Sequence, residues 1–341
     1  MKSNVLRFAG VLFAGWILAA CSGTQSVVPA SQAPVNAPTV SRGVNPDAVR
    51  VTFDDAMMAR NFVPMKAHVT PMRLKNPYKG LANRPDSTPV GYPLDMTKGT
   101  GPTVKSIAAY NIYVNEKNEA TWGDPEEFLK GLTGSPFAGL ITQYTGGAAS
   151  GYKFGGSMSV NYSLKYSNTF YNNDLFTILA SAVKHFQKVG LTAQYHLFLP
   201  PGIDTCFDQY GICYSPDNLN SFVFCAYHSA VAYNGQPILF SVEPYQNATV
   251  KIGSQTFYAC QNTVVPKGTN RLESGTASTL SHESFETWSD PLPNTGWFNP
   301  SYGAEIGDIC AYAFMQKQVL GSKSYWIQQE YSNAAHGCAS N

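Results

Sequence analysis

Six acidic residues and no Lys or Arg lie between Leu272 and Gln316. The chain as a whole is balanced, with 22 acidic and 23 basic residues, so this acidity is local. Carboxylates that pack without cationic partners repel one another unless they are solvated, protonated or gathered around a metal ion. A chain with this segment must therefore fold so that its acids face water, take up protons or share a cation. The six acids are Glu273, Glu283, Glu286, Asp290, Glu305 and Asp308.

The spacing within this segment predicts a metal-binding helix over residues 275–289. His282 and Glu286 are four residues apart, so on a helix both side chains can reach one point in space. Zinc helices of the His-Glu-x-x-His type have the same spacing, and here a carboxylate replaces the second histidine. We expect His282 and Glu286 to be metal ligands and Glu283 to be the catalytic general base. The alternative is a solvated surface helix whose polar face carries these residues.

A second acidic cluster supplies candidates for the third metal ligand. Glu305 and Asp308 follow Gly303 and flank Gly307, so a tight turn is expected to place both carboxylates. Zinc is the expected ion because it accepts both imidazole and carboxylate ligands. Calcium, which prefers a shell of oxygen ligands only, is the alternative.

Two further residues are candidates for positions that flank the site. Asp290 follows the expected helix on its polar side, and His228 lies in a strand that can pack beside it. For His228 a structural role in the core is the competing interpretation. His196, inside an apolar strand, is expected to be a core residue.

The N-terminus predicts export and a lipid anchor. Lys2 and Arg7 precede an apolar run that is too short for a membrane span and fits a signal peptide over residues 1–20. The run ends in Leu-Ala-Ala-Cys21, which resembles the lipobox of bacterial lipoproteins and implies a lipidated Cys21. Residues 21–45 then read as a flexible tether. We expect a bacterial cell-envelope protein, attached to the outer membrane through its lipid; an ordinary secretory signal is the alternative.

The cysteine count agrees with an oxidising compartment. Lipidation of Cys21 would leave six of the seven cysteines, and an even number favours three disulfides. Six cysteines allow 15 pairings. On proximity and order along the chain we predict Cys206–Cys213, Cys225–Cys260 and Cys310–Cys338.

The rest of the chain predicts a single α/β or α+β domain with a mixed sheet and flanking helices. Residues 46–102 are rich in proline and are expected to form irregular, extended surface segments, whereas residues 103–341 form the globular domain. The absence of a basic stripe argues against nucleic acid as a partner, and we expect a monomer. Strands are expected at 104–114, 157–165, 194–199, 221–232 and 237–244, and helices at 124–132, 135–144, 174–189 and 275–289.

Several motifs resemble the plant phosphate-induced protein or EXORDIUM family and its bacterial relatives. They are His-Glu-x-x-Glu-x-x-x-Asp-Pro at 282–291, Gly-x-Glu-Ile-x-Asp-x-Cys at 303–310, Leu-Pro-Pro-Gly at 199–202 and Phe-Cys-Ala-Tyr-His at 224–228. The resemblance covers about residues 103–341. It implies secretion and association with a cell wall, but no established activity. The order of elements is similar to that of zincin metallopeptidases, from which the missing second histidine departs.

Two hypotheses of function follow. The first is a zinc-dependent, peptidase-like hydrolase that acts on a peptide or cell-wall substrate. The second is a non-catalytic wall or surface binding module, in which the acidic cluster is structural or holds a metal ion for stability. The two differ in metal type, because carboxylates together with a histidine suit zinc, whereas a shell of carboxylate and carbonyl oxygens suits calcium.

Overall fold

The computed structural model describes most of the chain from Asp47 to Asn341. Contacts divide the chain into two units, residues 1–41 and residues 42–341, and every described residue belongs to the second. The predicted signal peptide, Cys21 and the tether lie outside the described residues. No helix in the described segments is both long and apolar enough to cross a membrane. The described residues are 47–65, 71–73, 94–166, 168–207, 212–216, 218, 222, 224–246, 249–252, 255–258, 260, 266–311 and 315–341.

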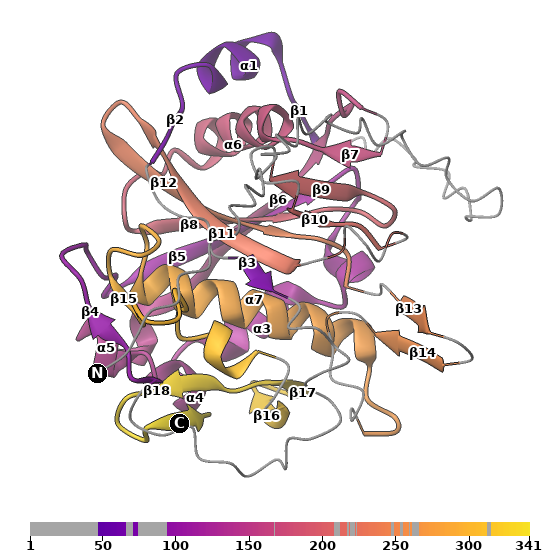
Figure 1. The fold of residues 1–341 in the computed structure, drawn as a ribbon. Helices are drawn as coiled ribbons and strands as arrows, with labels where there is room; N and C mark the ends of the chain where they lie inside the picture. The colour runs from indigo at the N-terminus through magenta and orange to yellow at the C-terminus, as the bar shows by residue number, and fades with distance from the viewer. Residues whose placement is uncertain are drawn as a thin grey trace, which may run out of the picture. The chain divides into compact units, whose positions relative to one another are not determined.

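A mixed eight-stranded sheet lies at the centre of the described unit (Figure 1). Its order is β1-β6-β5-β8-β12-β11-β2, and β3 also pairs with β11. The first five of these strands run parallel, whereas β11 is antiparallel to β12, β2 and β3. The predicted mixed sheet is therefore confirmed. The strands are β1 (Val49–Arg50), β2 (Val63–Pro64), β3 (Pro71–Arg73), β5 (Ile107–Val114), β6 (Tyr152–Asn161), β8 (Ala193–Phe198), β11 (Phe224–Tyr233) and β12 (Gln236–Glu243).

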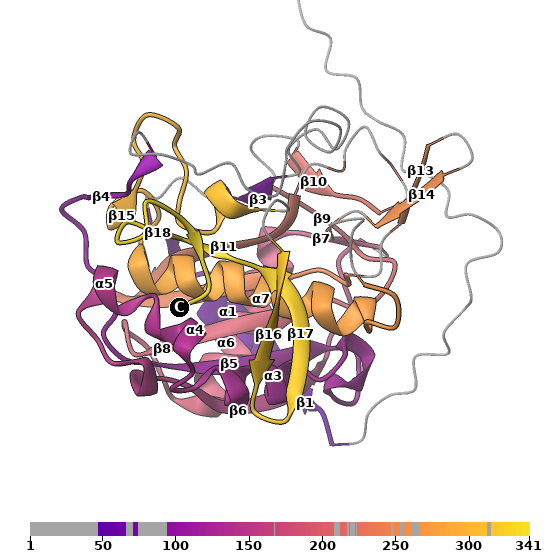
Figure 2. The same cartoon turned by 90° about the horizontal axis from the view of Figure 1, so that it is seen from below.

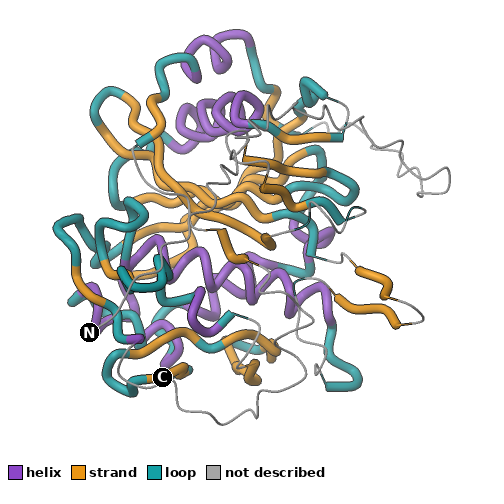
Figure 3. The backbone as a smooth tube through the Cα atoms, viewed as in Figure 1, coloured by secondary structure: helices purple, strands orange, loops and turns teal. Residues whose placement is uncertain are grey.

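Helices cover both faces of this sheet, as predicted (Figures 1 and 3). The helices α1 (Phe53–Ala59) and α6 (Asn172–Phe186) lie over one face. The helices α3 (Pro125–Leu132) and α7 (Arg271–Ser289) lie over the other face. The chain is thus a three-layer arrangement in which α7 is the longest helix of the described residues.

Alternation of side chains along the strands gives each face its own hydrophobic core. In β12, Ile238 and Phe240 join the core under α6, whereas Leu239 joins the core under α7. The same alternation places Ser241 and Glu243 on the α7 side, where both are buried. The face of the sheet that packs against α7 is therefore partly polar, and this is where the candidate site forms.

The helix α7 is enclosed by protein. All of its residues from 274 to 289 are buried, so the alternative of a solvated surface helix is wrong. The sheet covers one side, and the hairpin of β16 (Met315–Leu320) and β17 (Lys323–Gln328) covers the other (Figure 2). The hydroxyls of Ser274 and Ser278 each accept a hydrogen bond at 3.1 Å from a backbone N–H of β17. Small hydroxyl residues thus let the hairpin approach the helix closely.

Three disulfides are present, and all have the predicted partners. They join Cys206 to Cys213, Cys225 to Cys260, and Cys310 to Cys338. The third links the loop that follows α7 to the C-terminal strand β19 (Gly337–Ala339). This loop carries the second acidic cluster, so the disulfide restrains it.

The helix expected at 135–144 forms as two short helices, α4 (Pro136–Gly139) and α5 (Thr142–Thr145). Two further local features also differ from the predictions. Residues 46–102 were expected to be extended, yet α1 forms there because Thr52 and Asp55 make a capping box at its start. The helix α6 ends at Gln187, whose φ is +55°, rather than at Gly190. Both differences reflect local hydrogen bonding and backbone conformation that composition alone does not reveal.

The remaining elements are short and lie in the connections. One three-stranded sheet and four two-stranded ribbons surround the central sheet. Their strands are β16, β17 and β19, given above, together with β4 (Thr97–Lys98), β7 (Thr169–Phe170), β9 (Asp204–Phe207), β10 (Ile212–Tyr214), β13 (Thr249–Ile252), β14 (Gln255–Tyr258), β15 (Trp297–Phe298) and β18 (Glu330–Ser332). The connections also contain two short helices, α4 (Pro136–Gly139) and α5 (Thr142–Thr145).

Candidate metal centre

A row of polar side chains crosses four adjacent strands beneath α7. Asn111, His196, Ser241 and His228 occupy neighbouring register positions on β5, β8, β12 and β11. All four are buried. Buried polar groups require partners, so this row marks a place where the core serves a purpose other than apolar packing.

The middle of the row is a neutral hydrogen-bonded group. Nδ1 of His196 lies 2.7 Å from the Ser241 hydroxyl, which donates to Oε1 of Glu243 at 2.7 Å. Burial lowers the pKa of His196 to about 3. Burial and the nearby Glu283 carboxylate raise the pKa of Glu243 to about 8. Although His196 and Glu243 are 3.8 Å apart, these directions make the pair neutral rather than ionic.

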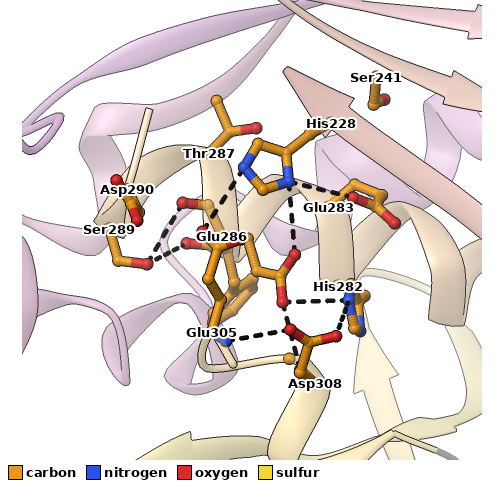
Figure 4. A network of polar contacts seen from close by, with 12 residues as sticks. His228, Ser241, His282, Glu283, Glu286, Thr287, Ser289, Asp290, Glu305 and Asp308 are labelled. Carbon is orange, nitrogen blue, oxygen red and sulfur yellow. Dashed lines mark hydrogen bonds and ion pairs between the residues drawn. The ribbon is translucent and has the colours of Figure 1, made fainter. Parts of the chain in front are cut away.

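The helix α7 brings its acidic residues to His228, at the end of the row (Figure 4). Nδ1 of His228 lies 3.2 Å from Oε2 of Glu283 and 3.4 Å from Oε2 of Glu286. The other carboxylate oxygen of Glu286, Oε1, lies 3.1 Å from Nε2 of His282. The predicted pairing of His282 and Glu286 across one helical turn is therefore present, and His228 joins it from the sheet.

The loop after α7 closes the cluster with the second pair of acids (Figure 4). Oε1 of Glu305 lies 3.6 Å from Nε2 of His228, and Oδ1 of Asp308 lies 3.9 Å from Nε2 of His282. The backbone N–H of Asp308 donates to Oε1 of Glu286 at 3.2 Å. Both acids that were predicted as alternatives for one ligand position are thus brought in, but beside different histidines.

Gly307 allows this loop to approach the helix. A Cβ atom at this position would lie 2.5 Å from Nδ1 and 2.7 Å from Cγ of His282. Its backbone is not in the left-handed region, so the requirement for glycine comes from space alone. The imidazole ring of His282 rests directly on the Cα atom of Gly307.

The cluster contains two donor groups that share one carboxylate. His282, Glu286 and Asp308 form the first group, and His228, Glu286 and Glu305 form the second. In each group the candidate ligand atoms all lie within 4.8 Å of one another. Two donors bound to one tetrahedral zinc ion at its usual bond lengths are roughly 3.3 Å apart, which is close to the separations of 3.1, 3.6 and 3.9 Å given above.

Several of these atoms lack hydrogen-bond partners among the described residues. They are Nε2 of His228, Nε2 of His282, Oε2 of Glu286 and both carboxylate oxygens of Glu305. A buried polar atom without a partner is costly and is rare in folded proteins. The atoms face one another at short range without forming hydrogen bonds, as expected for the ligands of a metal ion.

The charges of the cluster are balanced by its histidines in the absence of a metal. Burial acts to raise the pKa of Glu286, but the imidazoles of His282 and His228 lower it to about 2. The pKa values of both histidines lie well above the ordinary value, because nearby carboxylates overcome the effect of burial. Burial raises the pKa of Asp308 to about 7, with Glu286 adding to the shift, and raises that of Glu305 well above its ordinary value. A metal ion would replace the protons on the two rings.

The second neighbours of the two rings set which nitrogen faces the cluster. His228 has Glu283 beside Nδ1, so this carboxylate would hold a proton on Nδ1 and leave Nε2 as the nitrogen that a metal ion could bind. For His282, Nε2 of Gln328 lies 3.0 Å from Nδ1. The same amide nitrogen also donates to the Gly307 carbonyl at 3.2 Å, so Gln328 fixes the position of the His282 ring relative to the loop.

Asp290 is near the cluster in sequence but has a structural role. Its carboxylate accepts hydrogen bonds from the backbone N–H groups of Asn294, Thr295 and Gly296 at 2.6, 3.1 and 2.6 Å. It therefore fixes the turn that follows α7, and it is not in either donor group.

Two residues beside the site escaped prediction. Gln328 contacts His282 and donates to the Gly307 carbonyl at 3.2 Å. Glu330 lies buried beside Gln328, and its pKa is well above the ordinary value because of burial. Their sequence signal is a pair of polar residues at the end of β17 and the start of β18, and the disulfide at Cys338 brings that region close to the site.

Comparison with known proteins found no matching family model, no matching curated protein and no matching solved structure. The resemblance to the EXORDIUM family stays a prediction. The proposed function therefore rests on the geometry of the candidate metal centre.

Proposed function

We propose that this protein is a divalent-metal-dependent hydrolase whose first ligands are His282, Glu286 and Asp308. The observation that carries the proposal is the unpartnered, buried Nε2 of His282, which faces Oε1 of Glu286 at 3.1 Å and Oδ1 of Asp308 at 3.9 Å. The proposed substrate is a peptide or a cell-wall polymer, and the proposed fold type is zincin-like. The family resemblance supports an extracytoplasmic location for the protein and for this substrate.

Zinc fits the donors better than calcium. Each donor group combines one imidazole nitrogen with carboxylate oxygens, which is a ligand set that zinc accepts. Calcium takes about six to eight oxygen ligands, and a site with a histidine nitrogen at its centre does not provide them. A bound zinc ion would act as a Lewis acid and would lower the pKa of water to about 7.

Glu283 is the proposed general base. One of its carboxylate oxygens contacts His228, and the other, Oε1, has no partner among the described residues. Burial raises its pKa, and a base works best when its pKa is close to the working pH. The carboxylate is therefore held in place by one oxygen while the other is free to accept a proton.

A structural metal site is the second candidate function, and one observation favours it. The side chains of His282, Glu286, His228 and Glu305 are fully buried, and that of Asp308 is 13 % exposed. A hydrolase must admit its substrate to the ion, whereas a metal ion that only stabilises the fold has no such need. In this case the protein would be a binding module of the cell wall or surface.

Two substitutions separate these functions in purified protein with intact disulfides. Metal content measured by mass spectrometry, after loading with zinc or calcium, should show zinc bound in the wild type and a loss of zinc in His282→Ala. Glu283→Gln should keep the zinc and the melting temperature but lose hydrolysis of peptide and cell-wall substrates. If Glu283→Gln and wild type are equally inactive and both bind zinc, the structural function stands and the hydrolase is refuted. If neither metal binds to wild type, the metal centre itself is refuted.

We also propose an envelope location, with the protein anchored through a lipid on Cys21. Three disulfides support an oxidising compartment. Replacing Cys21 with Ser should abolish acyl labelling and release the protein from the membrane fraction. Unchanged labelling and fractionation would refute the anchor.

A further inference from the structure

Ligand atoms remain after the first metal ion is assigned. The first group uses His282, Asp308 and one oxygen of Glu286. Nε2 of His228 and both oxygens of Glu305 are also buried, and they too lack hydrogen-bond partners among the described residues. One ion in the first group leaves these atoms unsatisfied, so a single metal does not account for the cluster.

The carboxylate of Glu286 is oriented to serve both groups. Its Oε1 is 3.1 Å from His282 Nε2, and its Oε2, which has no hydrogen-bond partner among the described residues, is 3.4 Å from Nδ1 of His228. One oxygen of Glu286 lies within 4.8 Å of ligand atoms of both His228 and Glu305. The two oxygens therefore face two different histidines, one on the same helix and one on the sheet. A carboxylate that binds one ion through each oxygen holds the ions at a separation typical of two-metal sites, about 3.5–4 Å.

The tautomer of His228 is set for metal binding. Its Nδ1 lies 3.2 Å from Oε2 of Glu283, which accepts the ring proton. A carboxylate that accepts a hydrogen bond from the second ring nitrogen is the usual neighbour of a metal-bound histidine. With the proton held on Nδ1, a metal ion would bind at Nε2 of His228, which lies 3.6 Å from Oε1 of Glu305.

Direct hydrogen bonding does not explain this second group. An N–H···O bond has its donor and acceptor about 2.7–3.2 Å apart, and the His228–Glu305 separation of 3.6 Å is longer. Both Glu305 oxygens lack partners, although the residue is fully buried. An ion between the two side chains would satisfy atoms that direct contact leaves unsatisfied.

The formal charges also match two ions. Glu283, Glu286, Glu305 and Asp308 form no ion pair with Lys or Arg in the described part of the chain, and the ion pairs that they form there are with His228 and His282. Two divalent ions carry as much positive charge as these four carboxylates carry negative charge. One divalent ion balances only two of them.

We propose that the site is dinuclear, with Glu286 as the bridging ligand, His282 and Asp308 on the first ion, and His228 and Glu305 on the second. This inference rests on the proposed function, which it extends from one ion to two. Two-metal sites act on phosphate esters and on peptide bonds, because two ions can stabilise the attacking and the leaving groups together. The second ion thus keeps amide hydrolysis as the proposed reaction and adds a second point of contact for the substrate.

The number of bound ions tests the proposal. The full-length protein is stripped with a chelator, reloaded with zinc or manganese and desalted, and its metal-to-protein ratio is measured by mass spectrometry. We expect two ions in wild type and one in either His228→Ala or His282→Ala. Manganese-loaded wild type should give the electron paramagnetic resonance signal of two coupled ions, and each variant should give that of an isolated ion.

A matched control separates ligand loss from a disturbed core. His196→Ala removes another fully buried histidine from the same row of the sheet and should leave two ions bound. Glu305→Gln repeats the test of the second ion with little change in volume, in case His228→Ala does not fold. The circular dichroism spectrum of each variant shows whether it has folded.

Each other outcome overturns a different part. One ion in wild type that is lost in His282→Ala but kept in His228→Ala refutes the second site and leaves the proposed function standing. One ion that is lost only in His228→Ala refutes both the dinuclear centre and the proposed first ligands. No bound metal in wild type refutes both proposals. Loss of ions in His196→Ala to the same extent as in His228→Ala would show that only core packing was measured.

Discussion

Replacement of Gly307 by Ala should displace the His282 ring and weaken metal binding. The added Cβ would lie 2.5 Å from Nδ1, 2.7 Å from Cγ and 2.8 Å from Cε1 of His282. Non-bonded carbon atoms are in favourable contact at about 3.5–4.0 Å, so the ring or the loop must move by roughly 1 Å. The ring lies on a helix enclosed between sheet and hairpin, whereas the loop is tied down by the disulfide at Cys310. Neither side can yield without disturbing its neighbours.

The size of the effect can be worked out from this displacement. Overpacking of a tightly packed core costs about 1–3 kcal/mol. Ligand distances in metal sites are set to within about 0.2 Å, so a shift of roughly 1 Å is large. Changes in the residues that orient a metal-bound histidine lower metal affinity by about 10–100-fold, and we expect Gly307→Ala to lie at the upper end of this range.

Two measurements and one control check this prediction. Thermal unfolding followed by circular dichroism gives the loss of stability in metal-free protein, and competition with a chelator of known affinity gives the zinc affinity. The matched control is Gly303→Ala in the same loop, where φ is +57° and no atom lies within 4 Å of the added Cβ. That variant should lose about 1 kcal/mol through backbone strain but bind zinc normally. Wild-type zinc affinity in Gly307→Ala, or equal losses in the two variants, would refute the steric placement of His282.

Two further predictions concern residues outside the ligand set. Glu243 is protonated in the folded protein at neutral pH, because its pKa is raised from 4.5 to about 8. The stability that its protonated carboxyl group contributes is therefore complete below pH 4.5 and is lost as the pH rises through 8. Metal-free wild type should therefore melt at a lower temperature at pH 9 than Glu243→Gln, with a difference that grows by up to about 1.4 kcal/mol per pH unit between those values. Asp290→Ala should remove the acceptor of three backbone N–H groups and cost about 1–3 kcal/mol in thermal unfolding. Its metal content should match wild type, and a loss of metal there would contradict the structural role of Asp290.

The fold was predictable where the pattern is local. Alternating apolar residues indicated the central strands, and the order of the cysteines was enough to pair all three disulfides correctly. The burial of α7 was not predictable, because it depends on a hairpin that follows the helix by more than twenty residues in the chain. On the helix itself, His282, Glu283 and Glu286 look like any solvated face. Only the covering layers on both sides turn that face into a buried one.

The site, like the fold, was predictable only where its contacts lie within one local element. His282 and Glu286 are four residues apart on one helix, so helical geometry brings them together without reference to the rest of the protein. His228 could not be assigned from sequence, because a histidine in an apolar strand has the same surroundings whether it is structural or a ligand. Its place in the cluster depends on the register of β11 with β12 and on the packing of α7 over that row. Gln328 is a neighbour of His282 for the same long-range reason.

The burial of the cluster has a consequence for the order in which ions bind. Among the side chains of the two donor groups, only that of Asp308 is exposed to any degree, at 13 %. In the proposed dinuclear site this exposed side chain belongs to the first ion, whereas His228 and Glu305 have no exposed surface. We therefore expect the second ion of the proposed site to exchange more slowly than the first.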